Sequence, residues 1–151
     1  MAYTRGLYHI VIRTKDSVPA IAETHERDLY HYIYAFCNNR KCWVYRIGGM
    51  PDHFHLLMDI HPTLSISDFI RELKVSTHHF MKEHKDMFPY YRSWNSGYCA
   101  LSYSDSDIET VKEYIKNQKV HHKGLSVTDE LRKMLTERGI VINEEYFLKN
   151  V

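Results

Sequence analysis

Residues 48–60 read GGMPDHFHLLMDI, and this stretch decides the fold. In an extended strand, successive side chains point to opposite faces, so alternate residues share a face. One face of a strand over this run would carry only apolar side chains: Phe54, Leu56, Met58 and Ile60. The other face would carry His53 and His55 side by side. The run therefore predicts a strand that packs against a core on one side and could hold a metal ion on the other.

Segments on both sides of this run supply strands that could pair with it. Residues 7–15 alternate in strand fashion, and residues 42–47 and 98–103 also read as strands. Residues 48–52, with two glycines and a proline, have the composition of a turn. The histidine strand is therefore expected to form a hairpin with the strand that precedes it.

Two helices are expected between these strands. The first is expected over residues 19–38, because proline is tolerated in a first helical turn and the segment carries an apolar stripe. Ser65 or Ser67 could cap the second helix. Its apolar residues recur at helical spacing: Ile66, Phe69, Ile70, Leu73 and Phe80.

Two further helices are expected after the last strand. Residues 104–107 are short and polar and would cap a helix over residues 108–120. A short helix is expected over residues 128–138, and Gly139 would end it before an extended tail.

The predicted order of elements is βαββαβ followed by two helices. It matches a split βαβ, ferredoxin-like (RRM-like) arrangement of class α+β, in which two helices cover one face of a four-stranded antiparallel sheet. The histidines would lie on the other, open face. We expect a single domain over residues 1–151, with a sheet core (1–103), a helix (104–123) and a C-terminal helix and tail (124–151).

Composition is that of a globular protein. Apolar residues make up 44% of the 151 residues and charged residues 26%, which suffices for a core. The net charge is +1, so any affinity for nucleic acid would depend on local clusters of Lys and Arg.

The cysteines and the N-terminal segment predict a cytoplasmic protein. The three cysteines lack the spacing of a disulfide framework, which favours free thiols in a reducing compartment. The first residues lack the apolar core of a signal peptide, and no run has the length of a membrane span.

A second pair of residues joins the histidines as a candidate site. Tyr114 and Gln118 are four residues apart, so they share one face of the predicted helix, at the edge of its apolar stripe. The plain alternative is a border tyrosine beside a solvated glutamine. With 11 histidines in the chain, a chance His-x-His pair is also an alternative.

Several motifs taken together resemble one known family. They are GMPDHFHLL at residues 49–57, YIKNQ at residues 114–118, then His121-His122, the aromatic loop 88–98 and the tail 126–146. The chain resembles the small single-tyrosine transposases of bacterial insertion sequences, including REP-associated tyrosine transposases. These belong to the HUH (His-hydrophobic-His) endonuclease superfamily. The resemblance covers nearly the whole chain.

The resemblance implies a role for each motif residue. His53, His55 and Gln118 would bind a divalent metal, Mg²⁺ or Mn²⁺, and Tyr114 would be the nucleophile. The implied reaction cuts and rejoins single-stranded DNA through a covalent phosphotyrosine intermediate. The implied partners are hairpins near the element ends and a second copy of the chain. Tyr114 could meet the histidines of its own chain or of the second copy.

Six further residues are candidate DNA contacts. Single-stranded DNA needs cations for its backbone and flat rings for its bases. The candidates for stacking and charge are Tyr91, Arg92 and Trp94, and those for phosphate are Arg71, Lys74 and Lys116. A solvated surface or a packed loop is the alternative for each group.

Three other functions fit the same motifs. A domesticated relative could act on hairpins repeated in its own genome. A catalytically silent module of the same fold could only bind single strands. A small hydrolase could use metal-activated water and leave Tyr114 structural.

Overall fold

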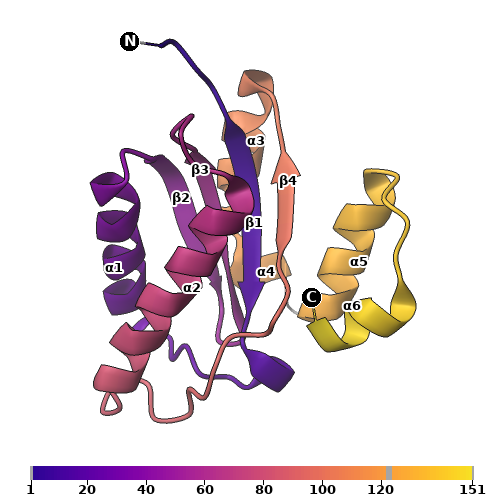
Figure 1. The fold of residues 1–151 in the computed structure, drawn as a ribbon. Helices are drawn as coiled ribbons and strands as arrows, with labels where there is room; N and C mark the ends of the chain where they lie inside the picture. The colour runs from indigo at the N-terminus through magenta and orange to yellow at the C-terminus, as the bar shows by residue number, and fades with distance from the viewer. Residues whose placement is uncertain (1, 122–123, 151) are drawn as a thin grey trace.

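The computed structural model describes residues 2–121 and 124–150, and its centre is a four-stranded antiparallel sheet (Figure 1). The strands are β1 (Leu7–Arg13), β2 (Trp43–Met50), β3 (His53–Asp59) and β4 (Cys99–Ser102). Their order in the sheet is β2-β3-β1-β4. This order is the one expected of a split βαβ arrangement, so the predicted α+β, ferredoxin-like fold is confirmed.

Two helices cover one face of the sheet: α1 (Glu26–Asn39) and α2 (Ile66–Glu83). The predicted apolar face of the histidine strand is buried beneath them, and Phe54, Leu56 and Met58 are fully inaccessible to solvent. Ser65 caps α2, as predicted, by accepting a hydrogen bond from the Asp68 amide at 3.1 Å.

The opposite face was predicted to be open, and that prediction is wrong. In Figure 1, α3 (Ile108–Lys116) and α4 (Gln118–His121) lie behind the sheet, and α5 (Val127–Glu137) and α6 (Glu144–Asn150) stand beside β4. Side chains of α3, α5 and α6 pack on this face. Leu57 packs against Val111 and Ile115 of α3, and Val11 packs in a cluster with Leu131 of α5. The face carries apolar side chains between its histidines, so burying it stabilises the fold.

The hairpin before β3 is tighter than its composition suggested. Strand β2 continues through Gly48 and Gly49, and only residues 51–52 form the turn. A Cβ on Gly49 would lie 2.3 Å from the His53 carbonyl oxygen, and one on Gly48 would lie 2.8 Å from the Ile115 carbonyl oxygen. These glycines therefore allow close approach of the neighbouring strand and of α3, instead of forming the turn.

The helices also differ from the prediction at three places. Helix α1 begins at Glu26 instead of residue 19, because buried Ile21 donates its amide to the Pro51 carbonyl at 2.8 Å and holds this segment against the hairpin. The helix predicted over residues 108–120 is interrupted at Asn117. The tail predicted to be extended contains α6, whose Phe147 is buried in the same cluster as Leu131.

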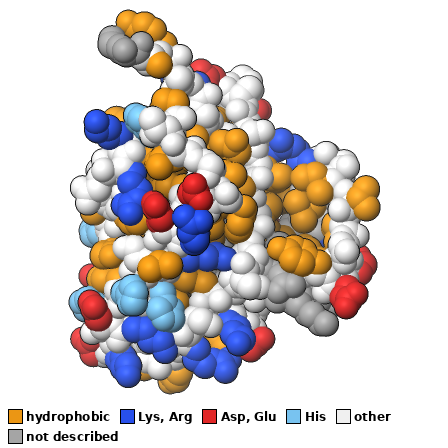
Figure 2. Space-filling model, viewed as in Figure 1, with side chains coloured by type: hydrophobic (Ala, Val, Ile, Leu, Met, Phe, Trp, Pro, Cys, Tyr) orange, Lys and Arg blue, Asp and Glu red, His pale blue; other side chains and the backbone are white. Residues whose placement is uncertain are grey.

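Figure 2 shows the face formed by α1 and α2. Lys and Arg side chains are mixed there with acidic and apolar ones, and they gather toward the lower end of this view. Among the described residues, no helix combines the length and the apolar character needed to cross a membrane.

Candidate functional site

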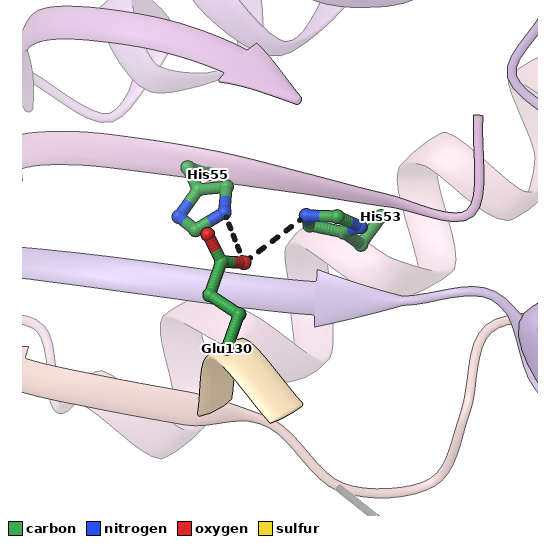
Figure 3. Close-up of side chains that lie close together, drawn as sticks. All are labelled: His53, His55 and Glu130. Atoms are coloured by element: carbon green, nitrogen blue, oxygen red, sulfur yellow. Dashed lines mark hydrogen bonds and ion pairs between the residues drawn. The ribbon is translucent and has the colours of Figure 1, made fainter. Parts of the chain in front are cut away.

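Strand β3 brings His53 and His55 together on the sheet face that α3 and α5 cover. Both side chains are fully buried, and their ring centroids are 5.1 Å apart. Their Nε2 atoms converge on one oxygen of Glu130, which lies 3.3 Å from that of His53 and 3.1 Å from that of His55 (Figure 3). The predicted pair thus faces a carboxylate instead of open solvent.

Sequence reasoning missed Glu130. This residue comes from α5 and is only 2% exposed. The sequence nevertheless contains a signal for a buried acidic residue. A single stripe at helical spacing is formed by Val127, Glu130, Leu131 and Met134. An acidic residue inside an apolar stripe must find a buried partner. The sequence alone could not tell that the partner is the histidine pair.

Gln118 and Tyr114 reach the same carboxylate from the other side. Gln118 is buried, its Nε2 donates to Glu130 Oε2 at 2.8 Å, and its Oε1 lies 3.2 Å from His53 Nε2. The Tyr114 hydroxyl also donates to Glu130 Oε2, and the Tyr114 ring lies 5.8 Å from the His55 ring. The four residues predicted from the motifs therefore come together within one chain.

Each imidazole has a second partner at its Nδ1 atom. Asp52 Oδ1 lies 2.7 Å from His53 Nδ1, and His9 Nε2 lies 2.7 Å from His55 Nδ1. His9 is on β1 and is 1% exposed. Since both Nδ1 atoms are engaged, both Nε2 atoms are directed toward Glu130.

The charges of the site depend on burial and on these carboxylates. Burial acts to lower the pKa of His53, but hydrogen bonds to Asp52 and Glu130 and the charges of both raise it to about 9. Burial, followed by the charge of His55, lowers the pKa of His9 well below its ordinary value. Burial and the hydrogen bond to Glu130 raise the pKa of Tyr114. Without a metal, a cationic His53 therefore sits between carboxylates, and the phenol is neutral at pH 7.

The donor atoms fit a divalent metal ion. One ligand atom each from His53, His55 and Glu130 lie within 4.8 Å of one another, and all three residues are buried. The Gln118 amide oxygen lies beside the same group. Two nitrogens with one or two oxygens suit Mn²⁺ and later transition metals well, and Mg²⁺ less well. Glu130 is thus a candidate ligand that the predicted set of His53, His55 and Gln118 did not include.

A cavity of about 260 Å³ lies alongside the tyrosine. Its lining includes Tyr114, His9, Tyr103 and Met134. Its volume is slightly below the range of about 300–1,000 Å³ that is usual for pockets that bind small ligands. The ring of Tyr114 thus has room beside it.

Three of the candidate DNA contacts are engaged by other parts of the protein. The Lys74 ammonium donates to the carbonyls of Asn95 and Gly97 at 2.8 and 2.7 Å, and burial lowers its pKa to about 8. Tyr91 and Trp94 are 5% and 8% exposed and pack in the main core. These contacts hold the loop after α2 in place, and they keep both rings from stacking on a base.

The other three candidates lie at the surface. Arg71 is exposed and pairs with Asp68 at 2.9 Å, and exposed Arg92 lies 3.6 Å from Asp16. Lys116 is exposed at the end of α3, close in sequence to Tyr114. These cations remain candidates for phosphate contacts. His122, the second residue of the His121-His122 motif, lies outside the described residues.

The chain matches the sequence model of one protein family. Its description is IS200-like transposase, and its model matches residues 2–118. The curated ISDra2 transposase TnpA of Deinococcus radiodurans is 33% identical to this chain over 73 residues, or 46% of the chain and 52% of that relative. The match therefore spans about half the length of the relative.

Two solved structures share the fold. The first is a protein of Deinococcus radiodurans R1 assigned to the transposases, with a TM-score of 0.60 and 24% identity, covering 78% of this chain and 95% of that one. The second is a REP-associated tyrosine transposase bound to a REP hairpin, with a TM-score of 0.61 and 17% identity, covering 85% of this chain and 76% of that one. At these identities the similarity is one of fold.

Proposed function

Because the chain belongs to the IS200-like transposase family, we propose that it cuts and rejoins single-stranded DNA with Tyr114 as nucleophile. In this proposal a divalent metal is held by His53 and His55, with Glu130 and Gln118 as further ligands. The observation that carries the proposal is one shared carboxylate: Glu130 accepts the Tyr114 hydroxyl while it faces both imidazoles. A phenol and a candidate metal site are thus in contact within one chain.

The proposed reaction is a transesterification. The Tyr114 oxygen forms a bond to phosphorus, a deoxyribose hydroxyl leaves, and a phosphotyrosine link remains. This link keeps the energy of an ester bond, so a second DNA end can attack it and rejoin the strand. Water as the nucleophile would not allow rejoining.

Glu130 is placed to assist the nucleophile. A phenol is a weak nucleophile at neutral pH, because its ordinary pKa is about 10. The Glu130 Oε2 atom that accepts the Tyr114 hydroxyl can take its proton during attack. A bound divalent ion, Mn²⁺ or Mg²⁺, would supply charge stabilisation for the phosphoryl oxygens. We expect Mn²⁺ to bind more tightly than Mg²⁺, because two ligands are imidazoles.

The proposed substrate is a single strand that folds into a hairpin at an element end. The fold shared with a transposase that was solved with a REP hairpin supports this choice. The proposed assembly is a homodimer, as the resemblance implies. Since Tyr114 meets Glu130 of its own chain, we propose that the site works in cis.

One experiment tests the proposal and separates it from its alternatives. Hairpin oligonucleotides from the flanks of the gene, and hairpins repeated elsewhere in the genome, are incubated separately with the protein and Mn²⁺, and covalent adducts are resolved by denaturing electrophoresis. Adducts that rejoin to a second strand support the transposase. Adducts only on hairpins repeated elsewhere in the genome support a domesticated nuclease. Free cut ends without adducts support a hydrolase, and binding without cutting supports a silent module.

Substitution of the proposed nucleophile sharpens this test. Tyr114→Phe removes the attacking oxygen and keeps the ring, so adducts should be lost while hairpin binding stays nearly unchanged. Tyr90→Phe is the matched control, since Tyr90 is 69% exposed in the loop after α2. An adduct yield from Tyr114→Phe equal to that of the unmodified protein would remove Tyr114 from the mechanism.

A further inference from the structure

We propose that His9 is a positioning residue that holds His55 in the tautomer able to bind metal. When a metal takes the lone pair of His55 Nε2, the proton of His55 lies on Nδ1 and His9 Nε2 accepts it; without a metal, His55 Nε2 instead donates to the Glu130 carboxylate. The inference rests on the proposed metal site, since it concerns one of the ligands of that site.

The sheet places the two rings in contact. Strands β1 and β3 are antiparallel, and Val11 lies opposite His55. His9 is two residues before Val11, so its side chain projects from the same face and is a diagonal neighbour of His55. The rings are 4.9 Å apart between centroids and tilted by 30°, and His9 Nε2 lies 2.7 Å from His55 Nδ1. Both side chains are buried, so the pair cannot exchange this contact for water.

Metal binding imposes the direction of the hydrogen bond. A neutral imidazole has one nitrogen that donates and one that accepts. If His55 Nε2 gives its lone pair to a metal, His55 Nδ1 carries the proton and needs an acceptor. Among the described residues, His9 Nε2 is the partner found at that atom. Ligand histidines commonly donate their second nitrogen in this way, and such partners fix ring orientation.

The other nitrogen of His9 is the second observation. His9 Nδ1 is buried and makes no hydrogen bond within the described part of the chain. If His9 Nε2 accepts, its own proton must lie on Nδ1, so a buried donor is left without a protein partner. Such a group destabilises a fold, and an apolar side chain at this position would avoid it. A histidine at this position, in place of an apolar residue without this penalty, points to a requirement for its acceptor nitrogen.

The two ligand histidines therefore have chemically different supports. Asp52 provides an anionic partner for His53, and His9 provides a neutral partner for His55. Loss of the His9 acceptor should weaken metal binding without removing any ligand.

The test measures Mn²⁺ binding by titration calorimetry, with no DNA present. His9→Leu and His9→Gln are compared with the unmodified protein. Leu and Gln are similar in size, but only Gln offers an oxygen near the position of His9 Nε2. We expect His9→Leu to weaken Mn²⁺ binding by about tenfold to hundredfold and His9→Gln to restore most of it. Thr77→Val is the control, because it removes a buried hydroxyl on the opposite side of the sheet.

The outcomes separate this inference from the proposed function. If His9→Leu lowers thermal stability as Thr77→Val does but binds Mn²⁺ as tightly as the unmodified protein, His9 is only a packing residue and the inference is wrong. If the unmodified protein does not bind Mn²⁺, the metal site itself fails, and the inference with it. Ring ¹⁵N shifts of His55 in unmodified, Cd²⁺-loaded protein give a check that needs no variant: a proton on Nδ1 is expected, and its absence overturns the proposal.

Discussion

Glu130 joins three parts of the site through two oxygens. Oε1 faces the imidazoles of His53 and His55, and Oε2 accepts hydrogen bonds from Gln118 and Tyr114. A buried carboxylate is costly unless it is paired, and here a cationic His53 and two donors compensate for the burial. The same atoms could exchange the histidine proton for a metal ion.

The ionisation of His53 makes stability depend on pH. Its folded pKa of about 9 lies above the value of about 6.5 expected when unfolded. A raised histidine pKa stabilises the fold fully below pH 6.5, and this contribution is lost as pH rises toward 9. Between pH 7 and pH 8.5 the metal-free protein should lose about 2 kcal/mol of unfolding free energy from this group.

Urea unfolding in the presence of a chelator measures this loss. At each pH, the free energy of unfolding of His53→Asn is subtracted from that of the unmodified protein. The subtraction cancels the pH dependence that comes from other groups, such as the buried cysteines and Lys74, which both proteins contain. The difference should shrink as pH rises. A constant difference would mean that His53 is not held as a cation.

At the level of elements, α5 both supplies the carboxylate of the site and controls whether solvent can reach the histidines. It carries Glu130 to the histidines, and it covers them so fully that neither is exposed. Because both imidazoles are buried, a phosphate would need α5 to shift before it could approach them. The stability of α5 should therefore affect activity.

The N-cap of α5 offers a mild way to weaken it. Ser126 Oγ accepts from the Asp129 amide at 3.2 Å, and replacing such a cap by alanine costs about 1 kcal/mol. Ser126→Ala should raise amide hydrogen exchange across residues 127–137 and leave α2 unchanged. Ser65→Ala, which removes the corresponding cap of α2, should raise amide hydrogen exchange in α2 and leave that of α5 unchanged. Equal exchange rates in α5 of Ser126→Ala and the unmodified protein would contradict the prediction.

For the whole molecule, the candidate ligands tie distant segments together. His53 and His55 are on β3, and Glu130 is 75 residues from His55 in the chain. Mn²⁺ at a hundredfold excess over its dissociation constant should raise stability by about 2.7 kcal/mol, which corresponds to a Tm increase on the order of 5–10 °C.

Thermal unfolding with and without Mn²⁺ tests this coupling. Glu130→Gln should reduce the increase, because a neutral amide is a weaker ligand than a carboxylate. Glu137→Gln, at the exposed end of the same helix, should leave the increase intact. An increase of the same size in Glu130→Gln would exclude this carboxylate as a ligand.

Sequence periodicity predicted much of this molecule. The alternation over residues 53–60, the helical stripe after Ser65 and the order of elements were sufficient for the fold. Errors arose where tertiary contacts outweigh local composition. Gly48 and Gly49 pair with β3 as part of a strand, where their lack of a side chain allows β3 and α3 to approach closely. Residues 19–25 are held by the hairpin instead of forming a helix.

The sequence by itself determined that His53 and His55 share a face and that Tyr114 and Gln118 share another, because both relations follow from the geometry of a single strand or helix. The tertiary structure alone decided that Glu130 and His9 meet them. His9 is 46 residues from His55, and Glu130 is farther still. Periodicity shows which face of an element is buried, but the segment that covers it is chosen by packing between elements that are remote in the chain.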